Sequence, residues 1–275
     1  MTEFSCHTWA FNDLTLVEAL GTIARLGFRY VDMGTGPHLN ITRATQSSTR
    51  QSLVREIRDD LELFNLQLAD LYLMLPRISV DDEKKRQADI TLFKALLPFA
   101  RSVGAPGVTI SAGLIHPEED DSAYQRTVIS LKEMVEAADA QEMPISIEPH
   151  LDSMAQTPQQ ALRLLDEIQG LDITLDWAQM VCQNVKDKDI ALLLPRTRHI
   201  QIRQAARSQL QVPYKRGRIK PEDVIRMVQQ ADYRGKICIE YMQTVGWHGM
   251  VEVNSIIEVT AMRDALRTAR DAVST

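Results

Sequence analysis

The stretch Pro144-Ile-Ser-Ile-Glu-Pro149 opens a unit that decides the fold of this chain. It is followed by Thr157-Pro158-Gln159-Gln160, which has the spacing of a helix start with a capping box and proline in the first turn. A second apolar run, Asp172–Trp177, comes next. Apolar and polar residues alternate in both runs, which predicts strands. The unit is therefore strand, helix, strand, and the same alternation extends in both directions along the chain.

Eight such units span the sequence. We predict strands at 4–9, 28–33, 67–75, 107–112, 144–149, 172–177, 198–204 and 236–241, and helices at 13–26, 82–103, 122–142, from 157 onward, 187–194, from 221 onward, and 253–273. No Gly/Ser-rich linker interrupts the series, and no Gly-x-Gly-x-x-Gly follows the first strand. The pattern predicts an α/β fold, a closed (β/α)₈ TIM barrel formed by residues 1–275 as a single domain, rather than an open doubly wound sheet.

Composition narrows the function classes. With 44% hydrophobic and 25% charged residues, the chain has the composition of a soluble globular protein. Its 31 basic and 37 acidic side chains give a net charge of -6, which disfavours a nucleic-acid partner. We find neither a secretory signal nor a run of the roughly 20 apolar residues that span a membrane. Three widely spaced cysteines, Cys6, Cys182 and Cys238, suit reduced thiols and indicate the cytoplasm.

Polar side chains gather at the carboxyl ends of the last four predicted strands. Because side chains alternate along a strand, the apolar set of each strand faces the helices and the polar set faces the barrel interior. The inward set near the carboxyl ends is Glu148, Asp176, Gln201 and Glu240. Three converging buried carboxylates repel one another unless a cation neutralises them. Four oxygen ligands without a thiolate favour one Mn²⁺ or Mg²⁺ ion, with Co²⁺ or Zn²⁺ as alternatives. The competing interpretation is four unrelated polar residues bonded to loop backbone.

Four segments carry a resemblance to a known family: Ile145-Ser-Ile-Glu-Pro-His150, Thr174-Leu-Asp-Trp-Ala-Gln179, His199-Ile-Gln-Ile-Arg-Gln204 and Ile237-Cys-Ile-Glu-Tyr241. They resemble the xylose isomerase-like TIM barrels, the sugar phosphate isomerase/epimerase superfamily, and among them most the hydroxypyruvate isomerase branch. The resemblance implies a metal held by Glu148, Asp176, Gln201 and Glu240, with the two glutamates as the acid/base pair. The sequence departs from the family at Gln201 and Gln179, where the family usually has a metal-binding and a substrate-binding histidine.

Further candidates for substrate contacts come from the residues themselves. The segment 196–220 contains eight Lys and Arg residues and no Asp or Glu, which suggests an anion clamp with Arg203 and Arg207 as its main members, or else a solvated basic loop or subunit contact. His150 shares a face with Glu148 and suits a proton carrier or a hydrogen-bond donor to substrate. His7 and Trp9 follow the first strand, and Gln179 takes the position of the family's substrate histidine.

These observations predict an isomerase or epimerase that depends on a divalent metal and acts by enediolate proton transfer on a small ketose, keto-acid or sugar acid or phosphate. Alternatives are a lyase or dehydratase of the same superfamily, of the keto-inositol dehydratase or 3-keto-glycoside-cleaving type, and a non-catalytic sugar-binding barrel. The DNA-cleaving endonuclease IV type ranks low because Gln179 and Gln201 remove metal ligands. We expect a small-molecule substrate, neither a nucleic-acid nor a membrane partner, and a homodimer or homotetramer.

Overall fold

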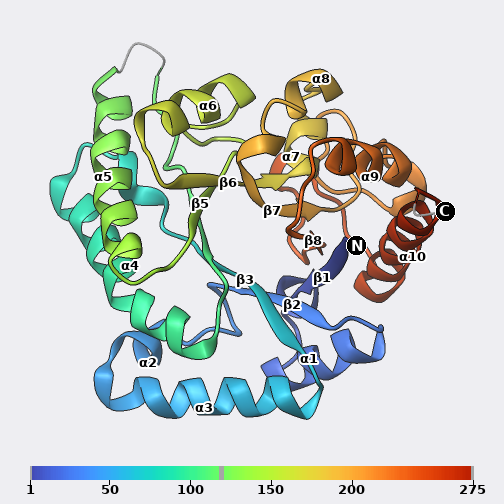
Figure 1. The fold of residues 1–275 in the computed structure, drawn as a ribbon, viewed down its shortest axis with the longest axis horizontal. Coiled ribbons are helices and arrows are strands. Elements are labelled where there is room, and N and C mark those ends of the chain that lie inside the picture. The colour runs from blue at the N-terminus through green and yellow to red at the C-terminus, as the bar shows by residue number, and fades with distance from the viewer. Residues whose placement is uncertain (1, 118–120, 274–275) are drawn as a thin grey trace.

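The protein is a closed barrel of eight parallel strands, as the sequence predicted. The computed structural model describes residues 2–117 and 121–273. Each strand pairs with its neighbours in sequence, and β8 closes the ring against β1. The helices lie around the outside of the strands (Figure 1). The strands are β1 (Glu3–His7), β2 (Tyr30–Gly34), β3 (Gln67–Leu73), β4 (Val108–Ser111), β5 (Ile145–Glu148), β6 (Leu171–Asp176), β7 (Thr197–Ile202) and β8 (Lys236–Ile239).

Ten α-helices lie within the described residues: α1 (Leu16–Arg25), α2 (Ile41–Thr45), α3 (Ser47–Leu63), α4 (Glu83–Val103), α5 (Asp121–Asp139), α6 (Pro158–Glu167), α7 (Trp177–Cys182), α8 (Asp187–Ile190), α9 (Pro221–Gln230) and α10 (Ser255–Val273). The capping box predicted at Thr157 is present and starts α6.

Three helices, α2, α3 and α7, were not predicted from the sequence. The first turn of α3 is polar and no side chain caps it, although Leu53, Val54, Ile57 and Leu61 give it a buried stripe at helical spacing. The helix α7 starts directly at the end of β6, because the Oδ1 atom of Asp176 accepts a hydrogen bond from the Ala178 N–H at 2.8 Å.

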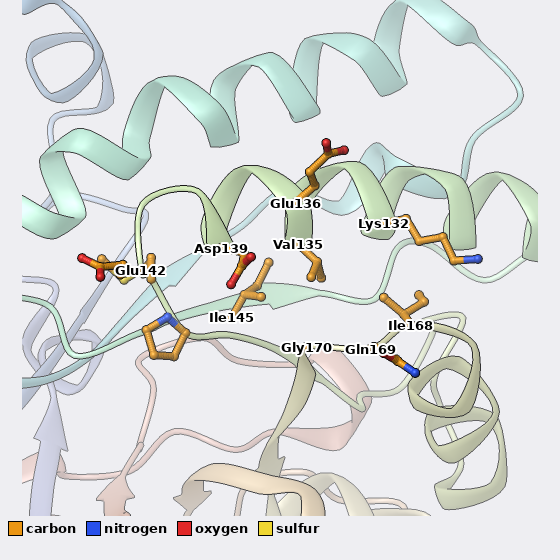
Figure 2. A pocket seen from close by; sticks show the side chains of 11 residues that line it. Lys132, Val135, Glu136, Asp139, Glu142, Ile145, Ile168, Gln169 and Gly170 are labelled. Carbon is orange, nitrogen blue, oxygen red and sulfur yellow. The ribbon is translucent and has the colours of Figure 1, made fainter.

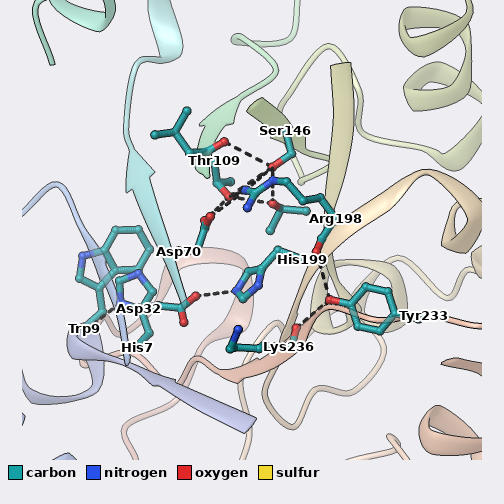
Figure 3. A network of polar contacts seen from close by, with 12 residues as sticks. His7, Trp9, Asp32, Asp70, Thr109, Ser146, Arg198, His199, Tyr233 and Lys236 are labelled. Carbon is teal, nitrogen blue, oxygen red and sulfur yellow. Dashed lines mark hydrogen bonds and ion pairs between the residues drawn. The ribbon is translucent and has the colours of Figure 1, made fainter. Parts of the chain in front are cut away.

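Polar side chains fill the barrel interior nearest the amino ends of the strands. The hydroxyl of Thr174 lies 2.7 Å from those of both Thr109 and Ser146. Arg198 enters this layer from β7, and its Nη2 atom lies 2.7 Å from the Oδ1 atom of Asp70 (Figure 3). This network closes the amino end of the barrel.

A second interior contact joins β2 to β7, where the Nε2 atom of His199 lies 2.6 Å from the Oδ2 atom of Asp32 (Figure 3). The apolar sets of β5–β8, such as Ile147 and Ile239, are fully buried in the core that the strands share with the helices. The alternation predicted from the sequence is thus confirmed: polar residues face the interior and apolar ones face the helices. No helix among the described residues is long and apolar enough to cross a membrane.

Candidate active site

A cavity of about 310 Å³ opens at the carboxyl ends of the strands, the end where TIM-barrel active sites lie. It collects residues from β3, β5 and the loops that follow the strands. Its lining is formed by Trp9, Tyr72, Met74, Pro76, Ser111, Leu114, Glu148, His150, Leu151, Asp152, Gln179, Arg203, Glu240, Met242 and Trp247. Of the predicted site residues, it brings together both glutamates, His150, Gln179, Arg203 and Trp9.

The centre of the site is an arginine held between two carboxylates. The Nη2 atom of Arg203 lies 3.0 Å from the Oδ2 atom of Asp176, and its Nη1 atom forms an ion pair with the Oε2 atom of Glu240. The same Nη1 atom donates to the Glu240 carbonyl oxygen at 3.2 Å. Arg203 is only 1% exposed, so its ion pairs with Asp176 and Glu240 are shielded from water. The sequence predicted Arg203 as part of an anion clamp for substrate, but its guanidinium is bound to the protein's own carboxylates.

Glu148 has a different partner, the phenol of Tyr72 on β3. The Tyr72 hydroxyl donates to the Oε2 atom of Glu148 at 2.5 Å, and both residues are buried. Burial, together with the nearby Glu148 carboxylate, raises the pKa of Tyr72 well above its usual value. The phenol therefore stays protonated and remains a hydrogen-bond donor to Glu148. The sequence analysis did not identify Tyr72, although it lies two residues after Asp70 on the inward face of a predicted strand.

The surroundings of Glu240 and Asp176 favour the neutral, protonated form of these side chains. Burial raises the pKa of Glu240 well above its usual value, although Arg203 opposes the shift. Burial likewise raises the pKa of Asp176 to about 6, again against the effect of Arg203. A glutamate whose pKa is raised by burial is suited to donate a proton near neutral pH.

Several buried polar atoms at and beside these carboxylates lack a hydrogen bond. Within the described part of the chain these are both amide atoms of Gln201, the Nε atom of Arg203 and the Oδ2 atom of Asp176, which has only the ion-pair contact with Arg203. Buried donors and acceptors are normally paired, and of these residues Arg203 lines the cavity, so its unpaired Nε–H is a candidate donor to a ligand there.

Three further predicted residues shape the wall of the cavity. The imidazole of His150 lies 2.8 Å from the Ser111 hydroxyl through Nε2 and 2.6 Å from the Leu151 carbonyl oxygen through Nδ1. Gln179 accepts the Leu151 N–H at 3.0 Å and so anchors the loop after β5. Trp9 packs against Tyr72 with ring centroids 5.2 Å apart.

Two predicted substrate contacts, His7 and Arg207, do not line this cavity. His7 is fully buried beneath Trp9, where its Nδ1 atom accepts the Trp9 N–H at 3.0 Å. The reason is a 3₁₀ turn at Thr8–Phe11 that breaks the strand alternation directly after His7. Arg207 is exposed and does not line the cavity. The basic segment 196–220 is dispersed rather than clustered, with Arg198 at the amino end of the barrel and Arg203 inside the site.

The predicted carboxylate ligands of a divalent ion already have partners within the protein. Each carboxylate has a protein partner: Tyr72 for Glu148, and Arg203 for both Asp176 and Glu240. A cation thus already lies between two of the predicted ligands, and the set as it stands does not fit a divalent ion.

A second set of residues has ligand atoms close enough together to bind one metal ion. In the described part of the chain, the one set of three His, Cys, Asp or Glu residues whose ligand atoms all lie within 4.8 Å of one another is Asp32, His199 and Cys238. It is buried in the barrel interior, where Asp32 is already bonded to His199. Burial raises the pKa of Cys238 well above its usual value, which disfavours the thiolate that a metal needs.

A second cavity, of about 540 Å³, lies at the opposite end of the barrel, beside the starts of β5 and β6. Figure 2 shows Lys132, Glu136 and Asp139 projecting from α5 beside it. These side chains are exposed or partly exposed, and the cavity lacks a buried, paired acid and base like those at the carboxyl ends of the strands.

The family assignment rests on a match that covers most of the chain. Residues 20–269 match the family model described as xylose isomerase-like TIM barrel. The chain therefore belongs to the xylose isomerase-like TIM barrel family. No curated protein matches this sequence.

Solved structures with the same fold include several sugar epimerases. D-allulose 3-epimerase from Methylomonas sp. superposes with a TM-score of 0.77 at 15% identity, over 98% of each chain. D-psicose 3-epimerase from Clostridium cellulolyticum gives 0.74 at 13% identity, over 98% of this chain and 99% of the other. The 3-keto-D-glucoside 4-epimerase of E. coli gives 0.74 at 16% identity, over 98% of this chain and all of the other. At these identities the likeness establishes the fold.

Proposed function

We propose that this protein is an isomerase or epimerase that moves a proton at the carbon next to the carbonyl group of a small neutral ketose or keto-glycoside. The observation that carries the proposal is the pair Glu148 and Glu240, buried in one cavity and contributed by strands three places apart around the barrel. Tyr72 holds one glutamate and Arg203 holds the other. The sugar epimerases that share the fold support the substrate class.

The chemistry assigned to these groups is a balanced proton transfer. The Glu148 carboxylate removes the proton from the carbon that bears a hydroxyl next to the carbonyl, and the electron pair of that C–H bond moves onto the carbonyl oxygen. Glu240 then returns a proton. Return to the other face of the same carbon re-forms the carbonyl and gives the epimer. Return to the former carbonyl carbon gives the isomer, with the proton of the neighbouring hydroxyl passing to the former carbonyl oxygen as the new carbonyl forms.

A neutral substrate fits the charges of the cavity better than a phosphate or an acid. Among the described residues, Arg203 is the one Arg or Lys side chain that lines the cavity, and it is already paired with two carboxyl groups. Arg207, the other predicted anion contact, is exposed outside it. The divalent ion that the family resemblance implies is not part of this mechanism, because Arg203 lies between two of the ligands. We further propose that the chain acts as one domain in the cytoplasm, which its three buried free thiols support.

Deuterium exchange tests the proposal directly. The protein is incubated in D₂O with neutral ketohexoses, ketopentoses and 3-keto-glucosides, and separately with sugar phosphates and keto-acids, and the substrate carbons are followed by NMR. We expect deuterium next to the carbonyl of a neutral substrate, with a rate that falls about 100-fold or more in Glu148→Gln and Glu240→Gln. Glu136→Gln, at the far cavity, is the matched control and keeps the wild-type rate. Exchange with phosphates alone, or unchanged exchange in both variants, would contradict the proposal.

A further inference from the structure

We propose that the Arg203 guanidinium takes the place of a divalent metal ion in this cavity, so that the site polarises its substrate without a metal. The role given to the substrate rests on the proposed function. The position of the cation itself rests on contacts within the protein.

The contacts of Arg203 fix its guanidinium at the point where the predicted ligands converge. Its two terminal nitrogens contact different carboxyl groups, that of Asp176 at the end of β6 and that of Glu240 directly after β8. Arg203 directly follows β7, the strand that lies between these two in the barrel. A divalent ion shared by Asp176 and Glu240 would have to displace the guanidinium from both. That displacement would leave a buried arginine without partners, which is strongly unfavourable.

Two other positions that the family resemblance assigns to metal ligands, Gln201 and Glu148, also differ from an open metal site. Gln201, a neutral amide, faces the interior between Asp176 and Glu240 in strand order. The remaining carboxylate, Glu148, is held by the Tyr72 hydroxyl rather than left open. One fixed positive charge therefore lies among three carboxyl groups, in the role that the resemblance assigns to a metal ion.

Arg203 also keeps a free donor for substrate. Its Nε–H group is buried without a partner in the described part of the chain, and the residue lines the cavity. When the C–H electron pair moves onto the carbonyl oxygen of the substrate, that oxygen becomes negatively charged. The Nε–H group is the donor that we assign to this oxygen, and a charged, preorganised donor stabilises such an oxyanion strongly.

Metal binding is the test, since it needs no substrate. Purified wild-type protein is stripped with EDTA and titrated with Mn²⁺, with free Mn²⁺ followed by electron paramagnetic resonance and Tm by calorimetry. We expect no saturable binding at millimolar Mn²⁺ and no shift of Tm. Arg203→Ala removes the cation but keeps the carboxylates, so we expect it to bind one equivalent of Mn²⁺ and to gain roughly 5 °C in Tm at a saturating concentration. Arg207→Ala, an exposed arginine four residues away, is the matched control and behaves as the wild type.

Each outcome decides the inference. Stoichiometric Mn²⁺ binding by the wild type would overturn it, and so would a folded Arg203→Ala variant that binds no Mn²⁺. If Arg203→Ala does not fold, the wild-type titration still decides.

The deuterium-exchange assay separates this inference from the proposed function. Exchange that EDTA abolishes and Mn²⁺ restores would overturn the inference and leave the function standing. A lack of exchange with every sugar, combined with the expected metal titrations, would overturn the function and leave the cation position supported.

Discussion

At the scale of single residues, the site depends on which protein group each carboxylate has as its partner. Arg203 and Tyr72 are both buried, and each binds a glutamate that the mechanism needs. They differ in charge: Arg203 places a cation beside Glu240, whereas Tyr72 is a neutral hydrogen-bond donor to Glu148. The two glutamates are therefore held in different electrostatic environments, which is what a base and an acid acting on one substrate require.

Removing the Tyr72 hydroxyl tests the role of this hydrogen bond. Tyr72→Phe keeps the ring that packs against Trp9 but leaves the Glu148 carboxylate without its donor. A hydrogen bond to a charged group contributes about 1.5–3 kcal/mol, so we expect kcat for deuterium exchange to fall about tenfold or more while the fold is kept. Steady-state exchange kinetics and near-ultraviolet circular dichroism measure the two effects. An unchanged kcat in the folded variant would show that Tyr72 does not position Glu148.

At the scale of elements, β7 illustrates how one strand serves both stability and chemistry. Arg198 and His199, near its amino end, bind Asp70 and Asp32 in the barrel interior. Gln201 and Arg203, at its carboxyl end, belong to the site. The strand must keep its register for Arg203 to reach Asp176 and Glu240. The contacts at the amino end of β7 therefore help to position Arg203 at its carboxyl end.

The Arg198–Asp70 pair should therefore contribute strongly to stability. Arg198→Met leaves Asp70 buried without its cation, and we expect the free energy of unfolding to fall by about 3 kcal/mol or more. The double variant Asp70→Asn, Arg198→Met removes the unpaired charge and should recover more than half of that loss. Urea unfolding followed by circular dichroism measures all three proteins. A double variant no more stable than Arg198→Met would mean that the ion pair does not cause the loss.

At the scale of the whole molecule, much of the architecture could be predicted because the sequence pattern of a barrel strand is local. Alternation alone placed Glu148, Asp176, Gln201 and Glu240 on the inward face at one end. Alternation does not predict which groups a long side chain contacts. Arg203 can reach a substrate or its own carboxylates, and the choice depends on distances between strands that are set by closure of the barrel. The burial of His7 beneath Trp9 could not be predicted from alternation for a related reason, because a 3₁₀ turn follows His7 directly.

His7 also makes the stability of the whole barrel depend on pH. The pKa of His7 is lowered from 6.5 to about 3, mainly by burial, with Asp32 opposing the shift and His199, His38 and Arg203 adding to it. Below pH 6.5 the unfolded chain binds a proton at His7 that the folded chain excludes, so the stability present at higher pH is lost as pH falls from 6.5 toward 3. The loss from this one group is about 1.4 kcal/mol per pH unit in that window.

Replacing His7 with asparagine removes the imidazole but keeps a hydrogen-bond acceptor for the Trp9 N–H. His7→Asn retains an oxygen for the Trp9 N–H but does not titrate in this range. Urea unfolding at pH 7.5 and at pH 5.0 gives the free energy of unfolding for both proteins. We expect the wild type to lose about 2 kcal/mol more than His7→Asn between the two conditions, from the integrated one-proton linkage. Equal losses would show that His7 takes up its proton in the folded barrel as it does in the unfolded chain, which a fully buried imidazole without an acceptor at Nε2 should not do.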